Sequence, residues 1–129
     1  IGTPPANVVR AHAAGGVLTF RGARVSTALP PAILDGEVDV MYRAESLQLR
    51  HSQAPGTVAA EFTESTPLAG RHVATLRIDG MRVSVVTEQR PDARPGDTVH
   101  VEFPSVPDAF FDVKTGHRTT NADSTEALA

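Results

Sequence analysis

The 129-residue sequence contains no cysteine. This absence excludes disulfide bonds, thiolate zinc sites, iron–sulfur clusters and cysteine nucleophiles, and it fits a reducing compartment. No apolar run approaches the roughly 18–20 residues that a membrane-spanning helix requires, and no secretory signal pattern opens the chain. The composition, 40% apolar and 21% charged, is instead that of one globular domain.

Lysine is almost absent as well, since the basic residues are eleven arginines and Lys114 alone. A P-loop places its lysine directly after a glycine that ends a glycine-rich turn, and Val113 stands at that position here. The chain therefore has no phosphate-cradling loop of its own, and we expect that it neither binds nor hydrolyses ATP.

Charge and aromatic content disfavour nucleic acid as a partner. The formal net charge is −3, whereas proteins that bind polyanions usually carry a positive excess. The sequence has no tryptophan, one tyrosine and five phenylalanines, so it offers few stacking platforms for bases.

Short apolar stretches separated by glycine and proline run through the chain, and none continues as a ten-residue amphipathic helix. This spacing predicts an all-β barrel or sandwich. The clearest element is a hairpin at Asp79-Gly80, a dipeptide favoured by type I′ turns. Folding there puts Arg77 opposite Arg82 on one face and apolar residues opposite one another on the other. The apolar pairs are Ile78 with Met81, Leu76 with Val83 and Ala74 with Val85.

Candidate catalytic and metal residues are few. No Gly-x-Ser-x-Gly sequence places a serine on a strained turn. No two histidines show the spacing of paired metal ligands, and each falls in a different predicted strand or loop, so we expect exposed or edge histidines and no metal site. The histidines are His12, His51, His72, His100 and His117.

Two pairs of residues are candidates for contacts with other molecules. Arg77 and Arg82 are like charges on opposite strands, which is locally unfavourable. Either both extend into water or toward nearby carboxylates, or they face an acidic partner or a bound anion. Phe110 and Phe111 are neighbours in a predicted strand, so one of them should leave the core and either pack under the tail or anchor an interface.

Four segments, in order, resemble one protein family. Residues 1–7 are similar to the motif I-G-S-P-x-M-N, and residues 40–47 to L-G-[IV]-R-P-E-H-[IL]. Residues 93–99 contain P-G-[DE]-x-V, and residues 111–118 match F-D-x-x-T-G-x-R. These motifs belong to the C-terminal regulatory region of ATP-binding subunits of carbohydrate ABC importers, the maltose, trehalose and glycerol-phosphate type. The chain resembles that region over residues 1–118.

The resemblance implies a TOBE domain, an OB-like β-barrel assembly of short antiparallel strands without catalysis or cofactor of its own. ATP and Mg²⁺ would bind the nucleotide-binding domain of the full-length subunit. The turn-forming residues 52–56 mark an internal boundary that gives two lobes, about 1–52 and 53–118, and the small, polar residues 119–129 predict a disordered tail. The resemblance further implies a cytoplasmic homodimer, peripheral on the inner face of the membrane, that associates with the transporter's membrane subunits and in some relatives with a regulatory protein.

The same resemblance assigns roles to individual residues. Arg43 and Glu45 would form an ion pair that holds the first lobe, although Ala44 and Ser46 replace the family's proline and histidine. The C-terminal motif would close an edge of the domain and contribute to pairing, with Phe111 the expected anchor. Its other structural residues are Asp112, Gly116 and Arg118. The alternative function is a TOBE-type module that senses a small oxyanion or sugar through Arg77 and Arg82.

Overall fold

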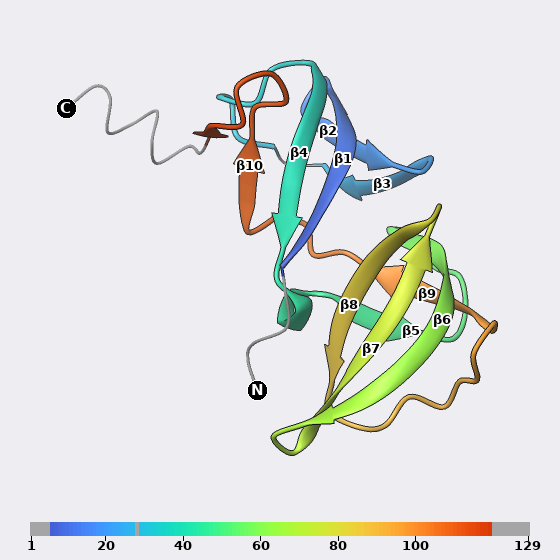
Figure 1. Ribbon diagram of the computed structural model, residues 1–129. Coiled ribbons are helices and arrows are strands. Elements are labelled where there is room, and N and C mark those ends of the chain that lie inside the picture. Colours follow the sequence, from blue (N-terminus) through green and yellow to red (C-terminus); the bar gives the residue numbers. More distant parts are fainter. Residues whose placement is uncertain (1–5, 28, 120–129) are drawn as a thin grey trace.

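The computed structural model describes residues 6–27 and 29–119, which form two antiparallel sheets (Figure 1). The first sheet has the strand order β11-β10-β4-β1-β2-β3, and the second has the order β5-β9-β6-β7-β8. The strands of the first sheet are β1 (Asn7–Ala14), β2 (Val17–Phe20), β3 (Ala23–Ser26), β4 (Gly36–Tyr42), β10 (Ala109–Phe111) and β11 (Arg118–Thr119). Those of the second are β5 (Gln48–Arg50), β6 (Thr57–Leu68), β7 (Arg71–Ile78), β8 (Met81–Thr87) and β9 (Thr98–Glu102).

The all-β prediction is confirmed. Within the described residues the only helical element is a single 3-10 turn, η1 (Ala44–Ser46), which links β4 to β5. The two sheets are separate hydrogen-bonded layers, and no closed barrel is formed by the described strands.

The expected division into lobes at residues 52 and 53 does not follow the sheets. β5 lies before that boundary but pairs with β9 of the second sheet. β10 and β11 lie after it but return to the first sheet, where β10 pairs with β4. The reason is that β4 and β9 each have an open edge, which a distant short strand completes. The chain therefore crosses between the sheets twice, before β5 and after β9 (Figure 1).

The predicted Asp79-Gly80 hairpin is confirmed in every pair. β7 and β8 align Ile78 with Met81, Leu76 with Val83 and Arg77 with Arg82. Gly80 has φ +81°, a left-handed conformation that a side chain with Cβ adopts only at a cost. The register follows from the turn, because a two-residue loop fixes which residues face each other.

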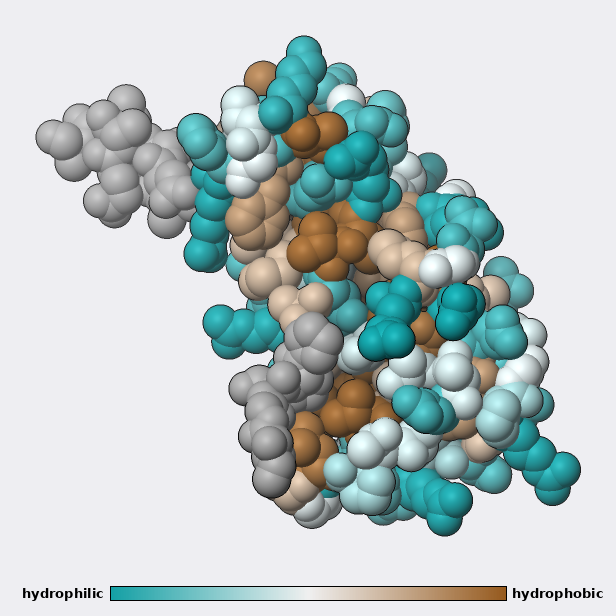
Figure 2. All heavy atoms as spheres, viewed as in Figure 1, coloured by the Kyte–Doolittle hydropathy of each residue, from teal (hydrophilic) through white to brown (hydrophobic). Residues whose placement is uncertain are grey.

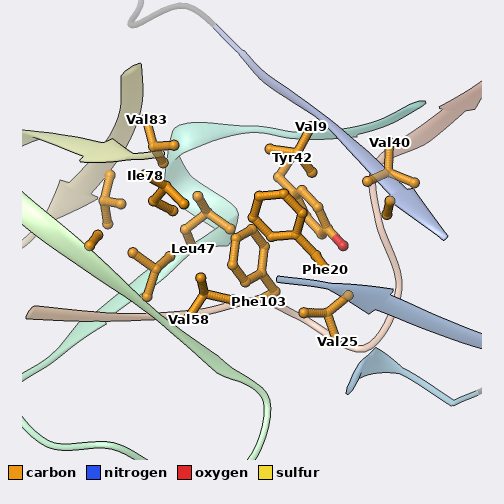
Figure 3. Close-up of a cluster of buried hydrophobic side chains, with 14 of the residues drawn as sticks. Val9, Phe20, Val25, Val40, Tyr42, Leu47, Val58, Ile78, Val83 and Phe103 are labelled. Carbon is orange, nitrogen blue, oxygen red and sulfur yellow. The ribbon is translucent and has the colours of Figure 1, made fainter. Parts of the chain in front are cut away.

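One hydrophobic core lies between the two sheets (Figure 3). Tyr42 at the end of β4 is fully buried, and its ring contacts Phe103 edge-on at a centroid distance of 4.9 Å. Phe103 in turn contacts Phe20 of β2 at 5.9 Å. Leu47, just after η1, is also buried there. These aromatic contacts bring both sheets into a single packed unit.

Parts of two expectations lie outside the described residues. The tail was expected from residue 119, but Thr119 belongs to β11, and residues 120–129 are not described. Of the first family motif, residues 1–5 are not described, and its last residue, Asn7, begins β1.

Candidate interaction surface on the first sheet

A small apolar patch lies on the outer face of the first sheet, away from the core. In a strand, alternate residues point to opposite faces, so the residues between the buried positions of β1, β4 and β10 share this face. Val8, Met41 and Ala109 lie opposite one another across the three strands, and Phe111 follows two residues after Ala109. Val8 is 51% exposed, and Met41 and Phe111 are half-buried. We call Val8, Met41 and Phe111 the outer patch, because Ala109 beside Met41 is buried, with 1% of its surface exposed. Figure 2 shows apolar surface over β10, β4 and β1 in this region.

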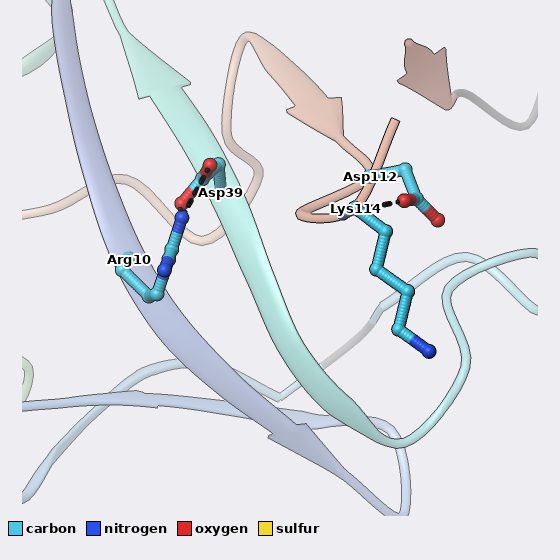
Figure 4. Close-up of polar contacts among 4 residues, drawn as sticks. All are labelled: Arg10, Asp39, Asp112 and Lys114. Carbon is cyan, nitrogen blue, oxygen red and sulfur yellow. Dashed lines mark hydrogen bonds and ion pairs between the residues drawn. The ribbon is translucent and has the colours of Figure 1, made fainter. Parts of the chain in front are cut away.

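An ion pair borders the outer patch. The Arg10 guanidinium on β1 donates to both carboxylate oxygens of Asp39 on β4, at 2.9 and 3.2 Å (Figure 4). This hydrogen-bonded contact raises the pKa of Arg10 above its ordinary value. Asp39 is also the residue opposite Phe111, which in turn lies opposite Arg118 of β11. A row of charged and aromatic side chains thus crosses four strands beside the apolar residues.

Of the two phenylalanines, only Phe111 faces away from the core. Phe110 is 4% exposed and lies in the hydrophobic core with its cross-strand neighbour Val40. The expectation that one of the pair leaves the core is confirmed, and Phe111 is that residue. Phe110 is therefore removed as a candidate for contact with another molecule, because its side chain is already packed inside the domain.

The loop between β10 and β11 explains the spacing of the F-D-x-x-T-G-x-R motif. The Asp112 carboxylate accepts hydrogen bonds from the Lys114 and Thr115 amides at 2.8 and 2.9 Å (Figure 4). These bonds hold the pKa of Asp112 below its usual value. Gly116, at φ +74°, donates its amide to the Asp112 carbonyl at 2.7 Å. The motif therefore builds a tight turn that returns the chain to pair Arg118 with Phe111.

The expected ion pair between Arg43 and Glu45 is not formed. Both side chains are exposed, and neither appears in an ion pair within the described residues. The loop is held instead by Asp108, whose carboxylate accepts hydrogen bonds from the Arg43 amide and the Ser46 hydroxyl, both at 2.8 Å. A carboxylate from a distant loop therefore stabilises the backbone of this turn, and the two charged side chains extend into solvent.

Two polar residues with structural contacts were missed by the sequence analysis. Asp108 belongs to no recognisable sequence motif, and only the fold brings its carboxylate close to η1. Asn7 ends the first family motif, which was the available signal, but the motif gives no indication of the contact that Asn7 makes. Its buried side chain binds the edge of the second sheet at Ser84.

The Arg77 and Arg82 side chains are exposed on the β7–β8 hairpin, as the register predicts. Arg77 lines a shallow hollow of about 360 Å³ together with Glu61 and Asp79. These two carboxylates lower the positive potential of the hollow. The arrangement therefore favours arginines that extend into water or toward nearby carboxylates over an anion site.

A larger open cleft of about 850 Å³ runs between β3 and residues 53–57 and 102–105. Near it, Arg21 of the β2–β3 turn forms an ion pair with Asp79 of the β7–β8 turn at 3.0 Å, joining the two sheets. No group of three potential ligands for a metal ion occurs among residues 6–27 and 29–119. The histidines are dispersed: His12, His51 and His117 are exposed, and His72 and His100 are half-buried.

No family model matches the chain, and no curated protein matches it either. In the part of the chain that the structure describes, no helix is long and apolar enough to cross a membrane. The features on which function can be argued are therefore the outer patch, its charged border and the four sequence motifs.

Proposed function

We propose that this chain is the regulatory and dimerisation domain of the ATP-binding subunit of a carbohydrate ABC importer, and that the outer patch pairs it with a second copy. The outer patch is the observation that carries the proposal. It is a small apolar surface on the outer sheet face, and it combines an aromatic residue with the neighbouring charges of Arg10, Asp39 and Arg118, as protein interfaces do at their border. Phe111 is the residue of this surface best suited to be a hot spot.

The motifs supply the importer part of the proposal. Each of the four is short, but they occur in the family's order along residues 1–118. The arrangement of the second sheet supports a TOBE-type, OB-like interpretation, because its two edge strands β5 and β8 lie against each other and η1 lies against β8. A sheet that curls back on itself in this way is related to a small barrel.

In this account the full-length subunit carries a nucleotide-binding domain before Ile1, works in the cytoplasm at the inner face of the membrane and contacts the transporter's membrane subunits. The regulatory domain holds two subunits together while their ATPase domains open and close around nucleotide. A regulatory protein is a further partner. The domain itself performs no catalysis, since all ATP chemistry belongs to the nucleotide-binding domain.

The isolated domain should pair weakly. An interface near ~800 Å² per partner supports affinities from micromolar to much tighter, depending on its anchors. The outer patch contains one aromatic anchor, and its other members are small or half-buried, so the association should be concentration-dependent. In the full-length subunit, pairing elsewhere raises the effective concentration of the two patches.

Two measurements test the importer assignment. The coding sequence upstream of Ile1 should encode a nucleotide-binding domain with a P-loop; an unrelated domain there would contradict the proposal. Calorimetry of the purified chain with Mg-ATP should show no binding, because no glycine-rich loop precedes Lys114. Micromolar binding of ATP would overturn the assignment.

A further inference from the structure

The η1 turn presents two opposite charges to solvent from a rigid backbone. Ala44 and Leu47 are each 1% exposed, so the turn is anchored in the core on one side. The Asp108 carboxylate fixes it on the other through the Arg43 amide and the Ser46 hydroxyl. The Ser46 amide also donates to the Arg43 carbonyl at 2.9 Å.

Within this turn, Arg43 and Glu45 do not neutralise each other. They are two residues apart, and in a turn with three residues per revolution such positions point in different directions. Both side chains are exposed without a charged partner in the described residues. The domain thus presents a positive and a negative group from one hydrogen-bonded turn, and within the described residues neither charge forms an ion pair.

The turn is continuous with the outer patch. Arg43 directly follows β4 and keeps an extended backbone, with φ −70° and ψ 151°, so it continues the alternation that places Met41 on the outer face. Asp108, which holds the turn, immediately precedes β10, whose first residue Ala109 lies opposite Met41 of the outer patch. Arg43 therefore borders the apolar surface at the end of β4 where Met41 lies, and Glu45 is exposed on the turn that follows.

We propose that Arg43 and Glu45 select a second copy of this chain as the partner of the outer patch, with Arg43 of each copy facing Glu45 of the other. The inference rests on the proposed dimerisation function. A surface with one positive and one negative group at fixed spacing is complementary to itself under a two-fold rotation, the symmetry of most homodimers. The same pair has no net charge and so gives no attraction to an anionic membrane or a uniformly acidic partner. Its effect is on partner choice and register, as is usual for charges at the border of an interface.

Charge exchange tests the proposal directly, with sedimentation equilibrium at low ionic strength as the readout. Arg43→Glu puts two negative groups at each facing position, and Glu45→Arg puts two positive groups there. Each variant alone should self-associate about tenfold more weakly than the parent, because like charges across an interface repel. The double variant Arg43→Glu/Glu45→Arg should recover pairing close to that of the parent. Mixing the two single variants should produce a heterodimer, since each then faces an opposite charge.

Two control variants separate this effect from a general change in charge. Arg82→Glu alters the net charge by the same amount as Arg43→Glu but lies on the β7–β8 hairpin of the second sheet. Glu61→Arg on β6 of the second sheet changes the net charge by the same amount as Glu45→Arg. Both controls should pair as the parent does. A doubly neutral variant, Arg43→Gln/Glu45→Gln, should lose most of the salt dependence of pairing. This variant provides the test if a charge-reversed variant fails to fold.

The outcomes distinguish the inference from the function on which it rests. A parent that stays monomeric contradicts both. A parent that dimerises while the single variants pair equally well, or while their mixture gives no heterodimer, contradicts the role of Arg43 and Glu45 and leaves the outer patch as the interface. Controls that weaken pairing as strongly as the single variants also overturn the inference.

Discussion

The carboxamide of Asn7 binds the backbone of Ser84 in the way that a neighbouring strand would. Its oxygen accepts the Ser84 amide at 2.8 Å, and its nitrogen donates to the Ser84 carbonyl at 2.9 Å. The same nitrogen lies 3.3 Å from the Tyr42 carbonyl. Asn7 begins β1 of the first sheet and Ser84 lies on the open edge of β8 in the second, so one side chain joins the two sheets.

Replacing Asn7 by alanine should therefore destabilise the domain by about 1–3 kcal/mol, because the buried amide and carbonyl of Ser84 lose their partners. Asn7→Asp should also destabilise, since a carboxylate has no N–H for the Ser84 carbonyl. Urea unfolding of both variants measures the loss, with the exposed Gln53→Ala as the control. A free energy of unfolding for Asn7→Ala equal to that of the control would contradict this account of the contact.

Tyr42 has a fully buried hydroxyl that makes no hydrogen bond with the described residues. Burial, with a smaller contribution from the charge of Asp108, raises the pKa of Tyr42 above its ordinary value. In the unfolded chain this phenol ionises near pH ~10, so the folded state should lose stability above that pH as the unfolded state releases its proton first. Because Tyr42 is the only tyrosine and the chain has no tryptophan, near-ultraviolet absorbance follows this one group.

We expect no tyrosinate absorbance in the folded protein around pH ~10–11 and its appearance on unfolding at the same pH. Tyr42→Phe should keep the aromatic contact with Phe103 and stabilise the domain by about 1 kcal/mol, since it removes an unpaired buried polar group. Ionisation of Tyr42 at an ordinary pH in the folded protein, or a clear loss of stability in Tyr42→Phe, would show that the hydroxyl has a partner or solvent access.

Asp112 should make the β10–β11 turn sensitive to acid. Its folded pKa lies below the unfolded one, so the stabilisation that it gives is present above about pH 4 and is lost as pH falls through the folded pKa. Asp112→Asn keeps an oxygen that can accept the Lys114 and Thr115 amides but cannot ionise, and it should flatten this dependence. Amide exchange at Gly116 as a function of pH is the measurement; equal pH profiles for the parent and Asp112→Asn would contradict the prediction.

The two facing arginines of the β7–β8 hairpin allow a test of the alternative function. Arg82→Glu puts a negative side chain directly across from Arg77 on the neighbouring strand. This change should leave the stability of the domain unchanged or raise it slightly. Phosphate and sulfate should not shift the melting temperature of the parent beyond their general salt effect. If an oxyanion specifically raises the melting temperature of the parent and Arg82→Glu abolishes this rise, the small-ligand function is favoured. The alternative is that Arg77 and Arg82 only extend into water or toward nearby carboxylates.

Local patterns predicted the all-β class and one hairpin, but they did not predict which distant strands pair. The Asp79-Gly80 hairpin was predictable to the residue pair, because the turn type and the alternation of apolar residues both act over a few positions. The alternation at Phe110 and Phe111 likewise predicted that one ring leaves the core, and the F-D-x-x-T-G motif indicated which.

The contacts that join distant segments were not predictable in the same way. Nothing near Asp108 indicates that its carboxylate holds the Arg43 amide, and short edge strands such as β5 and β10 can complete either sheet. The expected ion pair between Arg43 and Glu45 was wrong for the same reason: a long-range hydrogen bond stabilises their turn, and the side chains point to solvent. Hydrogen bonds across 35 to 77 residues of chain, as at Asn7, depend on the whole fold.

The pairing of two copies through the outer patch is the central claim, and sedimentation equilibrium across protein concentration tests it most directly. The parent should show a concentration-dependent dimer, and Phe111→Ala should weaken it clearly, because it removes the aromatic anchor from the face of β10. Leu34→Ala is the matched control, since Leu34 is 80% exposed and precedes the opposite end of β4 from Met41. The account predicts that this control pairs as the parent does. A parent that stays monomeric at about several hundred micromolar, which is well above the micromolar dissociation constant expected for such an interface, would contradict it. So would a Phe111→Ala variant that pairs equally well.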